Sequence, residues 1–429
     1  MTQGTAIPAS KQASTPRSVS GTLVVPSTLP GQVQLRPGTI RIHDGVIQSV
    51  EPRIDPHADL GGDGCIMSPG FIDTHVHLPQ FDSIGIDGLE LLDWLQRVIF
   101  PAEARWADEQ FAADMCQSVA RQMLSFGTTS IGAYATVHHA SAQVAIQTMA
   151  NAGLSGCVGQ VLMDRNAPAE LLRPASQLLD EAARLTGTGR IVPAITPRFA
   201  ISCTPELLNG SGTLAAARPW PVQTHLAETH AELQTINQLF PGVAYTEVYR
   251  RNGLLTPRTL LAHAIHLAPH DRRAIAEAGS IVAHCPTANL FLEAGKMDRN
   301  AALDASMRLT VGSDVAGGPD RSMVRVARSM LETAKRLHHR PPSAAQAWHA
   351  ITAGNADELA KACGVATGGL GGSLTPGTAA DLLVLRPDIR LEHSPDPLAA
   401  LLYAWDDRWI RYTLTGGQIR WNASESQKV

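Results

Sequence analysis

The 429-residue sequence predicts an α/β fold: a (β/α)8 TIM barrel with a small β-sandwich domain formed by the N- and C-terminal segments. Two features predict it. The long middle of the chain alternates short apolar stretches with helix-length connections, a pattern typical of parallel strands closed into a barrel. Both ends of the chain hold short alternating segments separated by turns, which indicates one sheet domain assembled from the two termini.

The chain divides into four expected parts. The first residues are rich in Ser, Thr, Ala and Pro and predict a disordered tail rather than a secretory signal. A hairpin that turns on Asp44-Gly45 belongs to the sandwich, and strand-and-turn sequences near the C-terminus complete that domain. The expected boundaries are 1–20 for the tail, 21–68 and 374–429 for the two parts of the sandwich, and 69–373 for the barrel.

Eight stretches predict the barrel strands, because β-branched and apolar residues gather there between turn signals. Helical patterns fill connections such as 89–100 and 323–337. Active sites of this fold lie at the C-terminal ends of the strands, so polar residues there are functional candidates. The expected strands are 71–76, 128–136, 157–164, 191–199, 221–228, 259–267, 280–286 and 308–314.

The first barrel strand ends in His75-Val76-His77. On a strand, residues i and i+2 point to the same side, so both imidazoles can face one point. This is a metal-ligand spacing, but a catalytic zinc usually takes three or more protein ligands and one open position for water. The remaining ligands must come from other strands.

Later strands supply them. The fifth ends near His225 and Glu228, the sixth near His263, and the eighth at Asp314. Taken singly, each histidine would be a packed or surface residue and the aspartate a buried structural acid, but their order along the barrel favours a metal site. The predicted ligands of this site are His75, His77, His225 and Asp314.

The fourth strand argues for a single metal ion. A two-metal site of this kind needs a bridging ligand, often a carbamylated lysine, near the end of that strand. No lysine lies between Lys11 and Lys296, so such a bridge is not available. Three histidines and one aspartate accept zinc or iron, and we expect one Zn²⁺ per chain, with Fe²⁺ as the alternative.

The remaining polar groups suit activation of water, because a bound metal lowers the pKa of water toward neutrality. Asp314 can accept the water proton, and Glu228 can protonate a ring nitrogen and then the leaving group. His263 can hold the attacking hydroxide or the developing charge on the substrate. Two alternatives stay open: Glu228 as the first acidic residue of a helix, stabilised by the helix dipole, and His284 as a pocket residue or as packing beneath the site.

Several stretches resemble known sequences. Residues 69–77, the late His and Asp series and the segment 372–382 resemble the amidohydrolase superfamily, over nearly the whole chain from about residue 21. Six shorter stretches are similar, more narrowly, to the guanine deaminase family within it. They are Pro79-Gln80, Leu92-Asp93-Trp94-Leu95, Phe100-Pro101-Ala102-Glu103, Thr196-Pro197-Arg198-Phe199, His225-Leu226-Ala227-Glu228 and Asp314-Val315-Ala316-Gly317-Gly318.

The resemblance implies a mononuclear zinc aminohydrolase that converts guanine and water to xanthine and ammonia in purine catabolism. It also implies that Gln80 and Arg198 hydrogen-bond the purine, with Arg198 on its carbonyl oxygen, and that Phe199 stacks on or walls the ring. A surface ion pair is the alternative for Arg198, but its place at a strand end favours the pocket. Donors aimed at a carbonyl would be left unpaired by adenine, which gives a physical basis for selectivity.

The sequence departs from the family pattern at three places, none of which removes a proposed catalytic group. Ala264 follows His263 where glycine is frequent, Ala288 replaces a frequent serine, and Pro319-Asp320-Arg321 stands where an aromatic residue is common. The last can reshape the pocket rim, so 8-oxoguanine, a pterin or an aminotriazine stays open as the substrate. A non-catalytic scaffold on the same fold would carry broken ligand motifs, whereas all four predicted ligands are present.

Composition limits the kinds of binding partner that we expect for this protein. The net charge of −4 offers no general attraction to nucleic acid, and no apolar run is long enough to span a membrane. The six cysteines are scattered without a C-x-x-C pair, which favours reduced thiols and a cytoplasmic location. We expect a small-molecule purine substrate and, from the resemblance, a homodimer.

Overall fold

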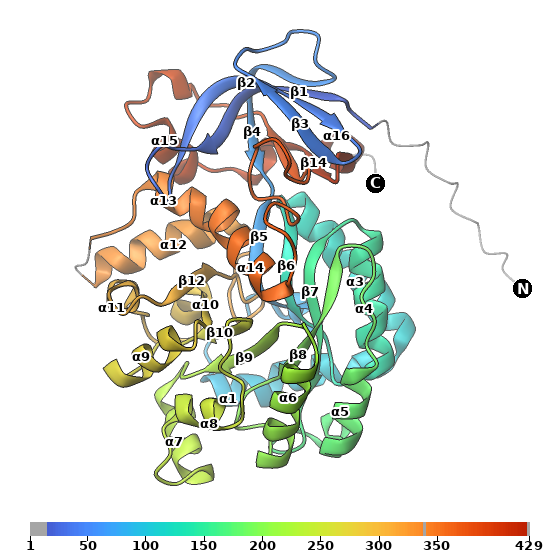
Figure 1. The fold of residues 1–429 in the computed structure, drawn as a ribbon, viewed down its shortest axis with the longest axis vertical. Coiled ribbons are helices and arrows are strands. Elements are labelled where there is room, and N and C mark those ends of the chain that lie inside the picture. The colour runs from blue at the N-terminus through green and yellow to red at the C-terminus, as the bar shows by residue number, and fades with distance from the viewer. Residues whose placement is uncertain (1–14, 338–339, 427–429) are drawn as a thin grey trace, which may run out of the picture.

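The computed structural model describes residues 15–337 and 340–426 and shows a parallel β/α barrel below a sheet made from both ends of the chain (Figure 1). The predicted fold class is confirmed. Most of the predicted tail, residues 1–14, lies outside the described residues, as does His338-His339. In the part of the chain that the structure describes, no helix is both long enough and apolar enough to cross a membrane.

The barrel sheet contains eight strands in sequential order, paired in parallel. Several of them end two to four residues before the predicted limit. After β9 and β10, Ala227 and Ala264 adopt positive φ angles of 51° and 49°, which turn the chain out of the sheet. Glu228 lies just beyond the end of β9 and Asp314 just beyond the end of β12, both in loops. The strands are β5 (Phe71–His77), β6 (Thr128–Tyr134), β7 (Ser155–Leu162), β8 (Ile191–Pro197), β9 (Val222–Leu226), β10 (Thr259–His263), β11 (Ile281–His284) and β12 (Arg308–Val311).

Side chains join the first and last barrel strands, β5 and β12. Asn355 donates from Nδ2 to the carbonyl oxygens of Ile72 and Val311, both at 2.7 Å, and its Oδ1 accepts from Val311 N at 2.8 Å. Thr74 Oγ1 donates to the same Val311 carbonyl, at 3.0 Å. All of these groups are buried, so water does not compete for their hydrogen bonds. We call this contact between β5 and β12, made through Asn355 and Thr74, the barrel seam; it joins the two strands that lead to His75 and Asp314.

Helices cover the outside of the barrel, and several begin at a residue that caps them. Asp108, Thr204, Thr229 and Ser343 each accept a hydrogen bond from a backbone N–H in the first turn of the helix that follows. The helices are α3 (Glu109–Ser125), α4 (His139–Asn151), α5 (Ala175–Ala183), α6 (Pro205–Ala217), α7 (His230–Leu239), α8 (Tyr245–Arg251), α9 (Pro269–Glu277), α10 (Pro286–Phe291), α11 (Arg299–Asp304), α12 (Met323–Arg336), α13 (Ala344–His349) and α14 (Asn355–Cys363).

The connection between β5 and β6 carries an extra helical segment over the open end of the barrel. It consists of α1 (Leu91–Trp94), one π-helical turn (Leu95–Ile99) and α2 (Phe100–Ala104). Its buried residues Leu91, Trp94 and Leu95 recur at helical spacing and face the cavity described below. This segment forms the roof of that cavity.

The second sheet is assembled from both ends of the chain and runs in the order β15-β14-β13-β4-β1-β2-β3. Its first strand includes Ser18–Ser20, which the sequence assigned to the tail, because Asp59 accepts hydrogen bonds from the backbone N–H groups of Arg17 and Ser18. The predicted hairpin on Asp44-Gly45 is confirmed. The strands are β1 (Ser18–Pro26), β2 (Val33–His43), β3 (Val46–Glu51), β4 (Leu60–Pro69), β13 (Leu382–Leu385), β14 (Ile410–Thr415) and β15 (Gln418–Asn422), with α15 (Pro397–Tyr403) and α16 (Ala423–Ser426) beside them.

Both faces of this sheet are buried at one of its inner strands, β13. Leu382 and Val384 point into a core made by the sheet strands themselves, as in a sandwich, whereas Leu383 and Leu385 point to a second core shared with α12, α13 and α15. Asp381, just before β13, accepts a hydrogen bond at 2.6 Å from Arg190, which lies in the loop before β8. This ion pair ties the sheet to the base of the barrel.

Candidate metal centre and purine pocket

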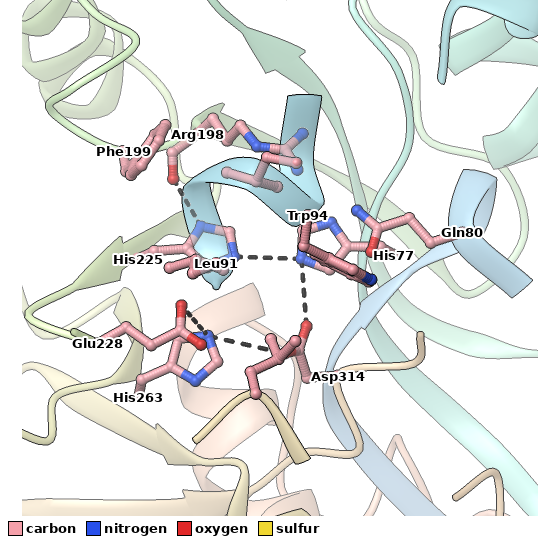
Figure 2. Close-up of a pocket in the computed structure, with 12 residues that line it drawn as sticks. His77, Gln80, Leu91, Trp94, Arg198, Phe199, His225, Glu228, His263 and Asp314 are labelled. Carbon is pink, nitrogen blue, oxygen red and sulfur yellow. Dashed lines mark hydrogen bonds and ion pairs between the residues drawn. The ribbon is translucent and has the colours of Figure 1, made fainter. Parts of the chain in front are cut away.

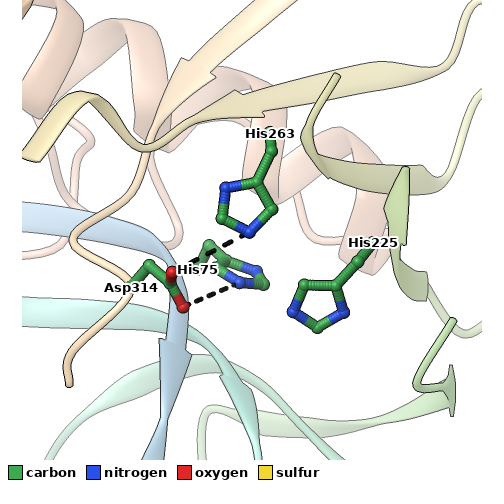
Figure 3. A group of neighbouring side chains, drawn as sticks. All are labelled: His75, His225, His263 and Asp314. Carbon is green, nitrogen blue, oxygen red and sulfur yellow. Dashed lines mark ion pairs between the residues drawn. The ribbon is translucent and has the colours of Figure 1, made fainter. Parts of the chain in front are cut away.

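The four predicted metal ligands meet at the C-terminal edge of the barrel (Figures 2 and 3). His75 and His77 come from β5, His225 from β9 and Asp314 from the loop after β12. His77 Nε2 lies 3.1 Å from His225 Nε2. Asp314 Oδ1 lies 3.3 Å from His75 Nε2 and 3.4 Å from His77 Nε2.

These separations fit one metal ion. Bonds of about 2.0–2.1 Å to a tetrahedral zinc place neighbouring ligand atoms about 3.3 Å apart, close to the three measured separations. Burial lowers the pKa of His75, His77 and His225 well below 6.5, so these rings are neutral and offer lone pairs. Among the described residues, the buried His75 Nε2 has no hydrogen-bond partner, as expected of a nitrogen that serves a cation.

Backbone carbonyls and neighbouring side chains orient these ligands. The Arg198 carbonyl oxygen lies 2.7 Å from His225 Nδ1, and because a carbonyl only accepts, Nδ1 carries the proton and Nε2 is left free for a metal. Asp314 N donates to the His75 carbonyl at 2.9 Å. A Cβ on Gly312 would lie 2.6 Å from His75 Cβ, so only glycine permits this close approach.

His263 lies beside this set. Its Nε2 is 3.3 Å from Glu228 Oε2 and 3.8 Å from Asp314 Oδ2, so it spans the carboxylates of both residues. The ligand atoms of His75, His225, His263 and Asp314 also lie within 4.8 Å of one another, which makes His263 a geometric rival of His77 for the metal (Figure 3). The shorter His77 distances favour His77 as the ligand and leave His263 facing the reaction space.

Glu228 points into the pocket and is buried. Burial, and then the negative charges of Asp314 and Glu232, raise the pKa of this carboxyl well above its usual value. The alternative in which Glu228 is the first acidic residue of a helix is wrong, because Thr229 caps α7 and Glu232 completes the capping box. Glu232 Oε2 instead accepts from Glu228 N at 2.7 Å, which fixes the backbone beneath the catalytic candidate.

The predicted purine-binding residues line the same cavity (Figure 2). Arg198 makes an ion pair, but that pair is buried rather than at the surface: Nη1 donates to both carboxylate oxygens of Glu103, at 2.7 and 2.8 Å. Gln80 also donates to Glu103, at 3.1 Å. Phe199 is buried at an edge-on angle to the His225 ring, with ring centroids 6.4 Å apart.

Sequence reasoning missed several residues of this cavity. Leu91, Trp94 and Leu95 form its roof, and Leu292 completes the lining. Within the described residues the buried indole N–H of Trp94 has no hydrogen-bond partner. The helical spacing of the roof residues was readable in the sequence, but what they cover was not. Of the predicted candidates, His284 is buried at the end of β11, and the described residues that line the cavity do not include it.

Comparison with known proteins places this site in a family. The family model described as "Amidohydrolase family" matches residues 66–420. The guanine deaminase of Escherichia coli K12 is 31% identical over 372 residues, 83% of each chain. The guanine deaminase of Dictyostelium discoideum is 33% identical over 299 residues, which cover 67% of this chain and 66% of that protein's length.

A solved structure agrees over nearly the whole fold. The guanine deaminase of C. acetobutylicum, with guanine bound in its active site, superposes with a TM-score of 0.85 at 26% identity and covers 94% of this chain and 99% of its own. Fold, site geometry and sequence similarity therefore agree, and the chain belongs to the amidohydrolase family, within which it groups with the guanine deaminases.

Proposed function

We propose that this protein deaminates guanine to xanthine and ammonia by hydrolysis. The observation that carries the proposal is a single cavity in which Arg198 and Gln80 form one wall and the His/Asp cluster with Glu228 forms the opposite side (Figure 2). The guanine deaminases named above support the same reaction.

His75, His77, His225 and Asp314 would hold one divalent metal ion, with zinc as the expected ion and iron as the alternative. When bound there, the ion would lower the pKa of a water molecule toward neutrality. The donor set fits such an ion because it offers three neutral imidazoles and one carboxylate in a buried space.

Arg198 and Gln80 would orient the purine. A guanidinium N–H of Arg198 donates to the purine carbonyl oxygen, and Phe199 packs against the ring. Burial of this wall excludes water, so a ligand that left the Arg198 donors unpaired would bind poorly.

Glu228, Asp314 and His263 would move the protons. Asp314 accepts a proton from water as oxygen attacks the carbon that bears the amino group, and Glu228 donates its proton to the adjacent ring nitrogen. His263 Nε2 lies between the carboxylates of these two residues, where it can hold the developing charge. Asp314 returns its proton to the amino nitrogen while the new hydroxyl gives its proton to Glu228, so the C–N bond breaks, the carbonyl forms and ammonia leaves with both carboxyl groups reset.

The test is release of ammonia from guanine by the purified, zinc-loaded protein, with 8-oxoguanine, a pterin and the aminotriazine ammeline measured in parallel. Strong preference for guanine supports the proposal. Activity on another compound alone would keep the chemistry and reject the substrate. Absence of turnover with one metal bound per chain would reject the proposed reaction.

The proposal extends to the cellular location, the pathway and the oligomeric state of the enzyme. We place the enzyme in the cytoplasm, in purine catabolism, as a homodimer without nucleic-acid or membrane partners. The net charge of −4 supports the absence of nucleic-acid partners, and the similarity to guanine deaminases supports a role in purine catabolism. Light scattering of the purified protein tests the dimer, and fractionation of the source cells tests the location.

A further inference from the structure

Glu103 is a buried acid that the proposed chemistry does not use. It lies on α2, in the Phe100–Glu103 stretch, and its side chain is only 1% exposed. Its carboxylate accepts two hydrogen bonds from Arg198 Nη1 and one from Gln80 Nε2. A buried carboxylate is costly unless it is paired and hydrogen-bonded. Here its partners are the two polar residues of the purine-binding wall.

The contact with Gln80 decides which way the side-chain amide faces. A carboxylate only accepts, so the amide nitrogen of Gln80 must turn toward Glu103. The amide oxygen then points away from Glu103, and Gln80 is one of the residues that line the cavity (Figure 2). Gln80 thereby presents an acceptor to the cavity.

The contact with Arg198 fixes the donor. Glu103 engages only Nη1 of the guanidinium, and the Phe100 ring lies beside the same group with its centroid 5.5 Å from Cζ. Within residues 15–337 and 340–426, Nε and Nη2 of Arg198 make no hydrogen bond to the protein, so both can donate to a ligand. One carboxylate therefore sets a donor and an acceptor next to each other on one wall.

We propose that Glu103 is a positioning residue that sets the purine preference of this pocket by fixing that donor–acceptor order. A donor beside an acceptor complements a ring carbonyl next to a ring N–H, as on the six-membered ring of guanine. The same pair opposes an amino group next to an unprotonated ring nitrogen, as in adenine or 2,6-diaminopurine, because like groups then face each other. This inference rests on the proposed guanine deamination.

The test compares Glu103→Gln with the wild type on guanine and on 2,6-diaminopurine. The variant keeps the size of the side chain. Its amide can donate as well as accept, so the Gln80 amide can rotate by 180°, and the ion pair with Arg198 is lost. We expect the ratio of kcat/KM values for the two purines to fall about 10- to 100-fold. The loss on guanine should lie mainly in KM, because Glu103 does not touch the reacting atoms, and the metal content should not change.

Further variants separate positioning from a structural role. Asp381→Asn alters another buried acid paired with an arginine, Arg190, at the far end of the barrel, and should lower stability while keeping KM and purine preference. Because part of the effect of Glu103 runs through Gln80 and part through Arg198, Glu103→Gln should change the purine preference less in a Gln80→Leu background than in the wild type. If Glu103→Gln fails to fold, Glu103→Asp takes its place. It keeps the charge but is too short to span both partners, so it should shift the same ratio.

The outcomes are distinct. A wild type that does not deaminate guanine rejects the proposed function. A wild type that does, together with a Glu103 variant that keeps the wild-type KM and preference, overturns the role of Glu103 alone. Equal loss of preference in Asp381→Asn would also overturn it, because the effect would then be general destabilisation.

Discussion

At the scale of single residues, the site is held in conformations that are unfavourable in isolation. His263 and Asp314 have φ angles of +68° and +52°, in the left-handed region that disfavours residues with a side chain. Such strain costs about 1–3 kcal/mol per residue and persists only where the surroundings enforce it. At His263 the enforcing contact is visible, since Asn289 Oδ1 lies 2.9 Å from Nδ1. An acceptor there holds the proton on Nδ1 and turns Nε2 toward the carboxylates.

Replacement of Glu228 by Gln tests the proposed proton donor. The amide keeps the shape but has no acidic proton, so turnover of guanine should fall about 10²- to 10⁴-fold, while one metal ion per chain remains bound. Ammonia release and metal analysis measure the two effects. Glu206→Gln, at the exposed start of α6, is the matched control and should be fully active. Full activity of Glu228→Gln would reject the role.

Metal analysis of two histidine variants tests which histidine is the ligand. His77→Ala should lose most of its metal, because His77 Nε2 lies at ligand separation from both His225 and Asp314. His263→Ala should keep about one ion per chain and lose turnover, because His263 faces Glu228 and Asp314 from beside the set. The reverse result would exchange the two assignments.

At the scale of elements, the metal site depends on how the barrel closes. The strand that supplies His75 and His77 and the one that leads to Asp314 are the first and last of the barrel sheet. They meet through Asn355 and Thr74. Asp73 strengthens the same seam, since its Oδ1 accepts from the backbone N–H of both His75 and Ser313. Ligand separation across the seam is thus set by buried hydrogen bonds.

Replacement of Asn355 by Ala tests this seam. The change removes three hydrogen bonds from buried backbone groups, and unmet groups of this kind cost about 1–3 kcal/mol each. We expect the free energy of unfolding to fall by about 3 kcal/mol and the metal to bind more weakly. Denaturation in urea and metal titration measure both.

Asn252→Ala is the control for that experiment. Asn252 follows the last residue of α8, and among the described residues its side chain makes one partly buried hydrogen bond, to the Val248 carbonyl, so its loss should cost far less. Equal effects of the two variants, or unchanged metal affinity in Asn355→Ala, would show that the seam does not hold the site.

At the scale of the whole molecule, the barrel places several ionisable groups close together in a buried space. Without a bound cation, their burial and the repulsion between like charges destabilise the folded state. His75, His77, His225, Glu228 and Asp314 are all at least nine-tenths buried. A ligand that binds only the folded state stabilises it, by about 2.7 kcal/mol at a concentration one hundred times its dissociation constant. The folded chain should therefore be markedly more stable with its metal than without.

Chelation tests this expectation. Removal of the metal with dipicolinate should lower the thermal midpoint and abolish ammonia release, and added zinc should restore both. His77→Ala is the control, because its midpoint should not respond to zinc. If the thermal midpoint of unfolding of the wild type is the same with and without metal, the proposed metal centre is wrong.

The sequence by itself determined the fold class, the eight barrel strands and the residues at their ends. It could do so because strand patterns are local and because parallel strands in a barrel all present their C-terminal ends to one edge. His75 and His77 followed from the two-residue period of a strand, and Asp314 from its place at the last strand. The proposed purine-binding residues came from the resemblance to a known family.

Only the tertiary structure decided what those residues touch. The roof over the cavity, the exact partners of Arg198 and the direction of the Gln80 amide depend on contacts between residues far apart in the chain, such as Glu103 with Arg198. The helix alternative for Glu228 failed because the true cap, Thr229, is one residue later. Local patterns do not encode these contacts, since packing and burial select among side-chain arrangements that the same sequence allows.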